Sequence, residues 1–253
     1  MKSAYLPVSM LAMIVAGCTA SQSDPASPAP PGSRTEVPQG LFSGSTSTGR
    51  QVTGIVLDDG TYYVLYSSAN NPGVIAGAVQ GTGSALNGSF TSTNGRDINL
   101  EGLGVLSASV SASYQLKASL NGTIAYPTLN QSPTFTSVYD ARDETAPSLA
   151  AIAGTYAGRA GSSRVVEDGT VTISLSGVVM ARGESGCTSS GRITPRAHGN
   201  AYDLTFTFGG APCLYPQALF TGGAYYDAAT RRVYGVALNA SRDAGFIFSG
   251  VKP

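Results

Sequence analysis

The residues that could carry chemistry in this chain are few and scattered. The single histidine, His198, lies in the stretch 196–200, which has the composition of a loop before a strand. A Ser-His-Asp hydrolase needs a histidine within reach of its serine, and α/β-hydrolases mark that serine with G-x-S-x-G, which this chain lacks. We therefore interpret His198 as a solvated turn residue and expect the protein not to be an enzyme.

Three acidic residues, Asp140, Asp143 and Glu144, suggest the paired carboxylates of glycoside hydrolysis. That reaction needs two acids facing each other across a substrate cleft, whereas these acids occupy a predicted connector. The glycine-rich stretch 77–83 is not followed by GK[ST], and Asp58-Asp59-Gly60 lacks the spacing of a calcium loop. We predict no catalytic residue, no metal site and no phosphate-binding loop.

The most specific chemistry belongs to a cysteine near the N-terminus. Lys2 is followed by an apolar run, 6–16, and small residues precede Cys18, which is the pattern of a cleaved secretory signal. The stretch Val15-Ala16-Gly17-Cys18 resembles the lipobox of bacterial lipoproteins. This resemblance implies that residues 1–17 are removed and that Cys18 then carries a diacylglycerol group and an N-acyl chain. We expect no cofactor besides this covalent lipid. The alternative is an ordinary signal peptide cleaved nearby, which leaves Cys18 as a free thiol.

Two or more acyl chains hold a protein on a bilayer durably, so the lipid on Cys18 would be a sufficient anchor. Thr19 follows the cysteine, whereas Asp at this position commonly retains lipoproteins at the inner membrane. We expect a protein anchored in the outer membrane that faces the periplasm or the cell surface. Its expected partners are that membrane and an envelope, surface or host protein. The chain has 15 basic residues (Lys and Arg) and 15 acidic residues (Asp and Glu), so its net charge is zero and does not indicate a nucleic-acid partner.

The remaining cysteines, Cys187 and Cys213, would lie in an oxidising compartment, where we predict that they form a disulfide. Their spacing is not C-x-x-C, and histidine ligands are lacking nearby, so a redox or zinc pair is the weaker interpretation.

The composition favours an all-β protein. The chain contains 32 Gly and no Trp, and 12% of its residues are charged, which suits short strands and turns better than long helices. The motif G-x-aromatic-x-G occurs at 40–44 and at 154–158, and a second echo relates 56–61 to 165–170. This order indicates two units of similar length.

We predict two tandem antiparallel units of about eight short strands, each a small barrel or a curled sheet, with a sandwich as the alternative. Asp59-Gly60 is the strongest hairpin signal. The expected segments are a signal peptide (1–17), a Pro/Ser-rich tether that begins with the lipidated cysteine (18–38), an N-terminal β domain (39–139), a linker (140–153) and a C-terminal β domain (154–253). The linker is expected to end in a short helical turn that Ser148 caps.

Tyrosines gather in two predicted strands and form a candidate binding surface, because tyrosine offers a broad contact area with a polar tip. The candidate residues are Tyr62, Tyr63, Tyr66, Tyr225 and Tyr226.

The second unit carries Gly186-Cys187, Ser190-Gly191 and Ala211-Pro212-Cys213 before a closing aromatic strand. In these features the chain resembles uncharacterised outer-membrane lipoproteins of Gram-negative bacteria with tandem small β-barrel-like domains. The resemblance implies a membrane-anchored, non-enzymatic binding or interaction protein of unknown ligand. The alternatives are a lipocalin-like carrier of a small apolar ligand and a passive structural component of the envelope.

Overall fold

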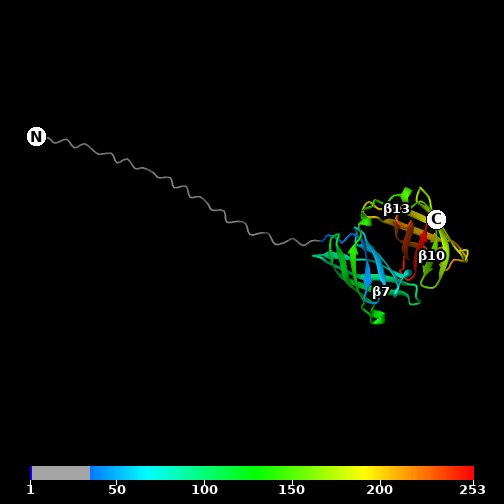
Figure 1. The fold of residues 1–253 in the computed structure, drawn as a ribbon, viewed down its shortest axis with the longest axis horizontal. Coiled ribbons are helices and arrows are strands. Elements are labelled where there is room, and N and C mark those ends of the chain that lie inside the picture. Colours follow the sequence, from blue (N-terminus) through cyan, green and yellow to red (C-terminus); the bar gives the residue numbers. More distant parts are fainter. Residues whose placement is uncertain (2–34) are drawn as a thin grey trace. The chain divides into compact units, whose positions relative to one another are not determined.

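The computed structural model describes residue 1 and residues 35–253, and the signal, the lipobox and most of the tether lie outside these residues. The described part contains two closed antiparallel barrels in tandem, which confirms the predicted fold class (Figure 1). Among the described residues, no helix is long and apolar enough to cross a membrane.

The first barrel is an up-and-down meander in which the first strand pairs with the last and one further pair bypasses a short strand. Its sheet runs β4-β3-β2-β1-β9-β8-β7-β6-β5, and β4 also pairs with β6, so the ring has eight strands and β5 is an appendage. The bounds are β1 (Gly40–Thr46), β2 (Gln51–Val56), β3 (Thr61–Ser68), β4 (Asn71–Thr82), β5 (Ser84–Leu86), β6 (Ser89–Asn99), β7 (Gly104–Gln115), β8 (Ser119–Ala125) and β9 (Thr134–Tyr139).

The second barrel is a simpler meander in which β10 pairs with β17, and all eight predicted strands are present. The bounds are β10 (Gly154–Ser162), β11 (Val166–Ile173), β12 (Val178–Gly183), β13 (Thr188–Pro195), β14 (Tyr202–Phe208), β15 (Leu219–Asp227), β16 (Arg232–Asn239) and β17 (Gly245–Val251).

The G-x-aromatic-x-G motif marks the closing seam of each barrel. A Cβ atom on Gly44 would lie 1.9 Å from the carbonyl oxygen of Thr136 on β9, the strand that flanks β1. A Cβ atom on Gly158 would lie 2.0 Å from the carbonyl oxygen of Ser249 on β17. Glycine is therefore required for the backbones to approach this closely.

The other residues of the motif also match between the barrels. Gly40 and Gly154 have φ values of 149° and 145° at the start of the first strand, a region that favours glycine. The aromatic residues, Phe42 and Tyr156, are 2% and 0% exposed and point into the two cores. The two motifs thus occupy equivalent positions.

The second echo is not equivalent in the structure. Asp59-Gly60 forms the predicted turn between β2 and β3, whereas Asp168-Gly169 lies inside β11. Asn87-Gly88 forms the turn between β5 and β6. Asn121-Gly122 has the composition of a turn but lies inside β8, where a Cβ atom on Gly122 would lie 2.3 Å from the Ser111 carbonyl oxygen of β7.

The predicted linker contains two short helices, η2 (Ala141–Glu144) and α1 (Leu149–Ile152). Ser148 caps α1 as predicted, accepting a hydrogen bond from the backbone N–H of Ala151 at 3.1 Å. Ile152 is 0% exposed in the core of the second barrel, and Tyr156 donates a 2.5 Å hydrogen bond to its carbonyl oxygen. Helix α1 therefore forms part of the second barrel's core rather than a free spacer.

Both barrels belong to one compact unit, Ser33–Pro253, and they share apolar contacts. Leu41 and Ile55 of the first barrel cluster with Tyr225 of the second. Ile98 packs against Gly245, where an added Cβ would lie 2.2 Å from the Ile98 side chain. The buried outer faces of the two walls fix the barrels against each other.

Candidate functional site

A cleft of about 960 Å³ lies between the barrels, close to the point where the chain enters β1. It is lined by residues that precede β1, by the β7–β8 turn, by η2 and by the β13–β14 loop. Ligand sites commonly measure about 300–1,000 Å³ and favour domain interfaces. We call this feature the inter-barrel cleft and treat it as the candidate site.

Asp143 is the least solvated charged residue of the inter-barrel cleft. It is 8% exposed, and its Oδ1 atom has no hydrogen-bond partner within the described part of the chain. The backbone N–H of Asn200 donates a hydrogen bond to the carboxylate. The backbone of Gly199 lies so close that a Cβ atom added to it would be only 3.0 Å from Oδ1 of Asp143. Burial raises the pKa of Asp143 above its ordinary value. A carboxylate oxygen thus stays unsatisfied beside the cleft.

Glu144 is already neutralised by a neighbour in the cleft. Its Oε1 atom lies 3.0 Å from Nζ of Lys117, and Tyr139 donates a 3.4 Å hydrogen bond to the same oxygen. The hydrogen bond from Lys117 lowers the pKa of Glu144. Both side chains of the pair are largely exposed, so this contact orders the rim of the cleft and adds little stability.

Asp140 has a structural role outside the cleft. Its carboxylate accepts hydrogen bonds from the Arg142 side chain, and Nη1 of Arg142 lies 2.7 Å from Oδ2 of Asp227 in the second barrel. These hydrogen bonds lower the pKa of Asp140. Asp227 is 5% exposed, so Arg142 ties the connector to the wall of the second barrel.

The structure brings His198 into the same cleft as Asp143 and Glu144. His198 is exposed and makes no hydrogen bond to another described residue. The loop position predicted for it is confirmed, because it lies between β13 and β14, but no pattern in the sequence indicated that this loop faces η2. That neighbourhood depends on the packing of two barrels that are remote in sequence.

The predicted tyrosine surface is wrong. Tyr62, Tyr66 and Tyr226 are 2%, 8% and 8% exposed and lie in the barrel cores. Tyr63 and Tyr225 pack in the cluster between the barrels, where Tyr225 is 7% exposed. Alternate tyrosines along each strand thus divide between the barrel core and the outer wall, and the outward ones face the other barrel instead of solvent.

Neither barrel encloses a central cavity of the size that a lipocalin-like carrier needs. The apolar spaces in the centres of the first and second barrels measure about 50 Å³ each, far below the size of a typical ligand site. Large side chains such as Phe90 and Phe220, at 2% and 0% exposure, fill the interiors. The lipocalin-like carrier predicted as an alternative is therefore contradicted by the packing.

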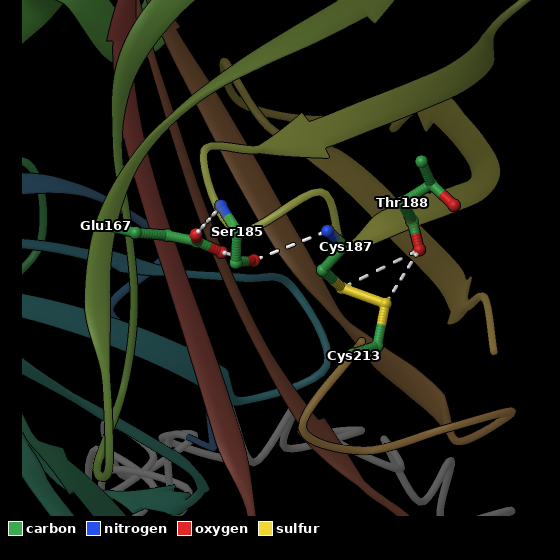
Figure 2. Close-up of a disulfide and its surroundings, with 5 residues drawn as sticks. All are labelled: Glu167, Ser185, Cys187, Thr188 and Cys213. Carbon is green, nitrogen blue, oxygen red and sulfur yellow. Dashed lines mark hydrogen bonds between the residues drawn. A yellow bond between two sulfur atoms is a disulfide. The ribbon is translucent and has the colours of Figure 1, made fainter. Parts of the chain in front are cut away.

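The predicted disulfide is confirmed. Cys187 and Cys213 are joined, with Cα atoms 4.6 Å apart, and link the β12–β13 turn to the β14–β15 loop. Figure 2 shows both sulfur atoms beside the Thr188 carbonyl oxygen, at 3.8 and 3.3 Å. In the same view, Glu167 accepts hydrogen bonds from Ser185 N and Oγ at 2.7 and 3.1 Å, which orders the β12–β13 turn.

The sequence contains the S-x-x-K spacing of a serine nucleophile and a lysine base at Ser249-Gly250-Val251-Lys252. Residues three apart in a strand point to opposite faces, and Ser249 is in β17. Ser249 accepts a 3.0 Å hydrogen bond from Arg232, while Lys252 donates to the carbonyl oxygen of Ala153. The motif does not bring a serine and a lysine together.

Within the described residues, no group of three or more His, Cys, Asp or Glu side chains could hold a metal ion.

Comparison with known proteins does not place the chain in a family. No family model matches it, and no curated protein matches it. A similar solved structure is that of a "putative outer membrane protein" from Bacteroides fragilis, with 14% identity, a match over 87% of this chain and 97% of that chain, and a TM-score of 0.26. At that identity and TM-score, the likeness carries no argument about this protein.

Proposed function

We propose that the protein is a lipid-anchored, non-enzymatic binding protein of the bacterial outer membrane that holds a segment of a partner protein in the inter-barrel cleft. The observation that carries this proposal is the cleft itself, at about 960 Å³, with a buried and unpartnered carboxylate oxygen of Asp143 beside it. Because the barrel centres are filled, a polypeptide segment can be recognised only on the outer surface, where this cleft lies.

The charges of the cleft indicate the chemistry of the partner. Four carboxylates line it: Glu36, Asp58, Asp143 and Glu144. Arg196 pairs with Asp58 and Lys117 pairs with Glu144, which leaves Glu36 and Asp143 without an ion pair among the described residues. Apolar side chains such as Val37 and Pro147 lie among them. An excess of acidic groups beside apolar contacts is complementary to a polypeptide segment that carries Lys or Arg next to apolar residues.

Binding explains these groups better than catalysis does. General base catalysis needs a base positioned against the proton that it abstracts. His198 has no hydrogen-bond partner among the described residues, and the Glu144 carboxylate is held by Lys117. The support for the anchor is the sequence Val15-Ala16-Gly17-Cys18, which lies outside the described residues.

The proposal is tested by capturing the full lipidated protein with its partner from outer membranes and comparing two tryptophan variants. Ala197 is exposed in the cleft, so Ala197→Trp would block it, whereas Ala228 is an exposed turn residue outside the cleft lining. We expect the wild-type protein and Ala228→Trp to retain the partner and Ala197→Trp to lose it. Equal retention by both variants would refute binding in the cleft. Absence of any stoichiometric partner would favour a passive structural component.

A further inference from the structure

A second concavity opens at the opposite end of the first barrel, among the β1–β2, β6–β7 and β8–β9 connections. Its volume is about 150 Å³, and we call it the barrel-mouth pocket. A water molecule occupies about 30 Å³ in the liquid, so the space suits about five waters or one small organic molecule.

An acidic side chain forms the inner end of the pocket. Asp97 on β6 points into the barrel and is 3% exposed. Its Oδ1 atom accepts a 2.8 Å hydrogen bond from the Tyr66 hydroxyl, which itself accepts one from Asn99 Nδ2 at 3.2 Å. The Tyr126 hydroxyl also hydrogen-bonds to this carboxylate. A carboxylate can accept about four hydrogen bonds, so acceptor capacity remains.

The basic residue of the pocket is occupied elsewhere. Arg50 Nη2 lies 2.7 Å from Glu101 Oε2, and Nη1 donates a 2.9 Å hydrogen bond to the Ser67 carbonyl oxygen. The guanidinium carbon lies 5.3 Å from the centre of the Tyr66 ring. The pocket lining therefore holds two carboxylates and one guanidinium, and ionised Asp97 leaves an excess of one negative charge.

From this geometry we infer that the barrel-mouth pocket binds a small organic cation of the alkylammonium class. The ammonium group would lie against the Asp97 carboxylate and the tyrosine hydroxyl oxygens, and the short alkyl part would contact Val52, Val64 and Ile124. A buried carboxylate without a contacting cation is costly, and an ammonium ligand would offset that cost. The inference uses a site separate from the inter-barrel cleft and does not rest on the proposed function.

The titration of Asp97 supports this inference. Burial raises the pKa of Asp97 to about 6. The hydrogen bonds of Tyr66 from β3 and of Tyr126 after β8 act in the opposite direction, as does the positive charge of Arg50, while the charge of Glu101 raises the pKa further. A bound cation would favour the ionised form and lower this pKa.

The test is calorimetric titration of the full mature chain with methylammonium, with acetate as the anionic control probe. The matched variants are Asp97→Asn and Asp168→Asn, which neutralise the pocket acid and an exposed acid of the second barrel that lines neither site. We expect methylammonium to bind the wild type and Asp168→Asn, to bind Asp97→Asn at least about tenfold more weakly, and to bind the wild type about tenfold more weakly at pH 5 than at pH 7. Acetate should not bind.

A second measurement keeps the test decisive if Asp97→Asn fails to fold. The carbon-13 resonance of the wild-type Asp97 carboxyl group should titrate at a lower pH in the presence of methylammonium. An unchanged titration, equal binding by both variants, or loss of binding in Asp168→Asn instead would overturn the inference. None of these outcomes affects the capture experiment at the inter-barrel cleft, so the two proposals can fail separately.

Discussion

Arg196 Nη2 lies 2.6 Å from Asp58 Oδ1, and this ion pair connects the β13–β14 loop of the second barrel to the β2–β3 turn of the first. Arg196 also contacts Asp59 at 3.2 Å and, through Nη1, Asp203 at 2.7 Å. Desolvation alone would lower the pKa of Arg196, but its carboxylate partners raise it overall. One guanidinium thus joins both walls at the edge of the inter-barrel cleft.

Removal of this contact should loosen the interface. Arg196→Ala should lower the free energy of unfolding by about 1–2 kcal/mol, because several charged hydrogen bonds are lost at a side chain that is only 18% exposed. Denaturant unfolding would measure the change, with Arg182→Ala on the exposed barrel wall as the control. A double-mutant cycle with Asp58→Asn should show coupling that weakens in high salt. Additive effects in that cycle would exclude the pair as a link between the barrels.

The closing seams should not tolerate a methyl group. Gly44→Ala and Gly158→Ala should each destabilise the protein by about 3 kcal/mol or more, because an added Cβ would lie within 2.0 Å of a backbone oxygen. Gly210 has nothing within 4 Å of an added Cβ, so Gly210→Ala is the control and should change stability little. Thermal unfolding provides the measurement. Equal melting temperatures for all three variants would show that the seams are looser than described.

The disulfide should stabilise the second barrel. Cys187 and Cys213 are 26 residues apart, and a closed loop of that length is worth about 3.5 kcal/mol on the chain-entropy model. The double substitution Cys187→Ser, Cys213→Ser should therefore lower the free energy of unfolding by about 3 kcal/mol. Reduction of the wild-type protein should have a similar effect. No response to either treatment would indicate that the loops are fixed by packing alone.

Asp97 should make stability depend on pH in a defined direction. Its pKa of about 6 in the folded protein exceeds the ordinary value of 3.8, so the folded state binds the proton more tightly than the unfolded state does. The stabilisation that comes from this tighter proton binding by Asp97 is fully present below about pH 4 and is lost as the pH rises through about 6. Because Asp97 is 3% exposed, the loss should amount to about 2–3 kcal/mol.

The matched measurement is the difference in unfolding free energy between wild type and Asp97→Asn at pH 4, 5, 6 and 7. The wild type should lose stability relative to the variant across this range, while the contribution of Asp143 cancels in the difference. A constant difference would show that Asp97 keeps an ordinary pKa.

Much of the fold could be predicted from local patterns. The turn at Asp59-Gly60 and the alternation of β14 follow from period-two hydrophobicity and from the positive φ values that tight turns require. Barrel closure was one of three predicted outcomes, because the pairing of the first strand of each barrel with the last, β1 with β9 and β10 with β17, leaves no local signal. The Asn94-Gly95 pair resembles a turn but lies at a register shift inside β6.

That shift also explains why the barrel-mouth pocket could not be predicted. Phe90 and Ser92 are buried before the irregularity, and Gly95 and Asp97 are buried after it, so the inward set changes from even to odd positions. A one-residue bulge reverses which face a side chain occupies. Without knowledge of the β6–β7 register, Asp97 would be predicted to lie on the surface of the barrel.

The inter-barrel cleft could not be predicted from local sequence patterns for a different reason. Asp143 and His198 are far apart in sequence, and each was correctly placed in a connection between strands. Their common cleft arises from the packing of two barrels, which depends on the outward faces of strands such as β2 and β15. The same packing buries Tyr225, which the sequence suggested as a binding residue.

The most direct test of binding at the cleft is site-specific photo-crosslinking in living cells. A photoreactive residue at position 197 would lie in the inter-barrel cleft, and one at position 228 would lie outside its lining. We expect one dominant crosslinked partner at position 197, little crosslinking at position 228, and a weaker product at position 197 in the variant Asp143→Lys. Equal crosslinking at both positions, or none at position 197, would contradict binding at the cleft.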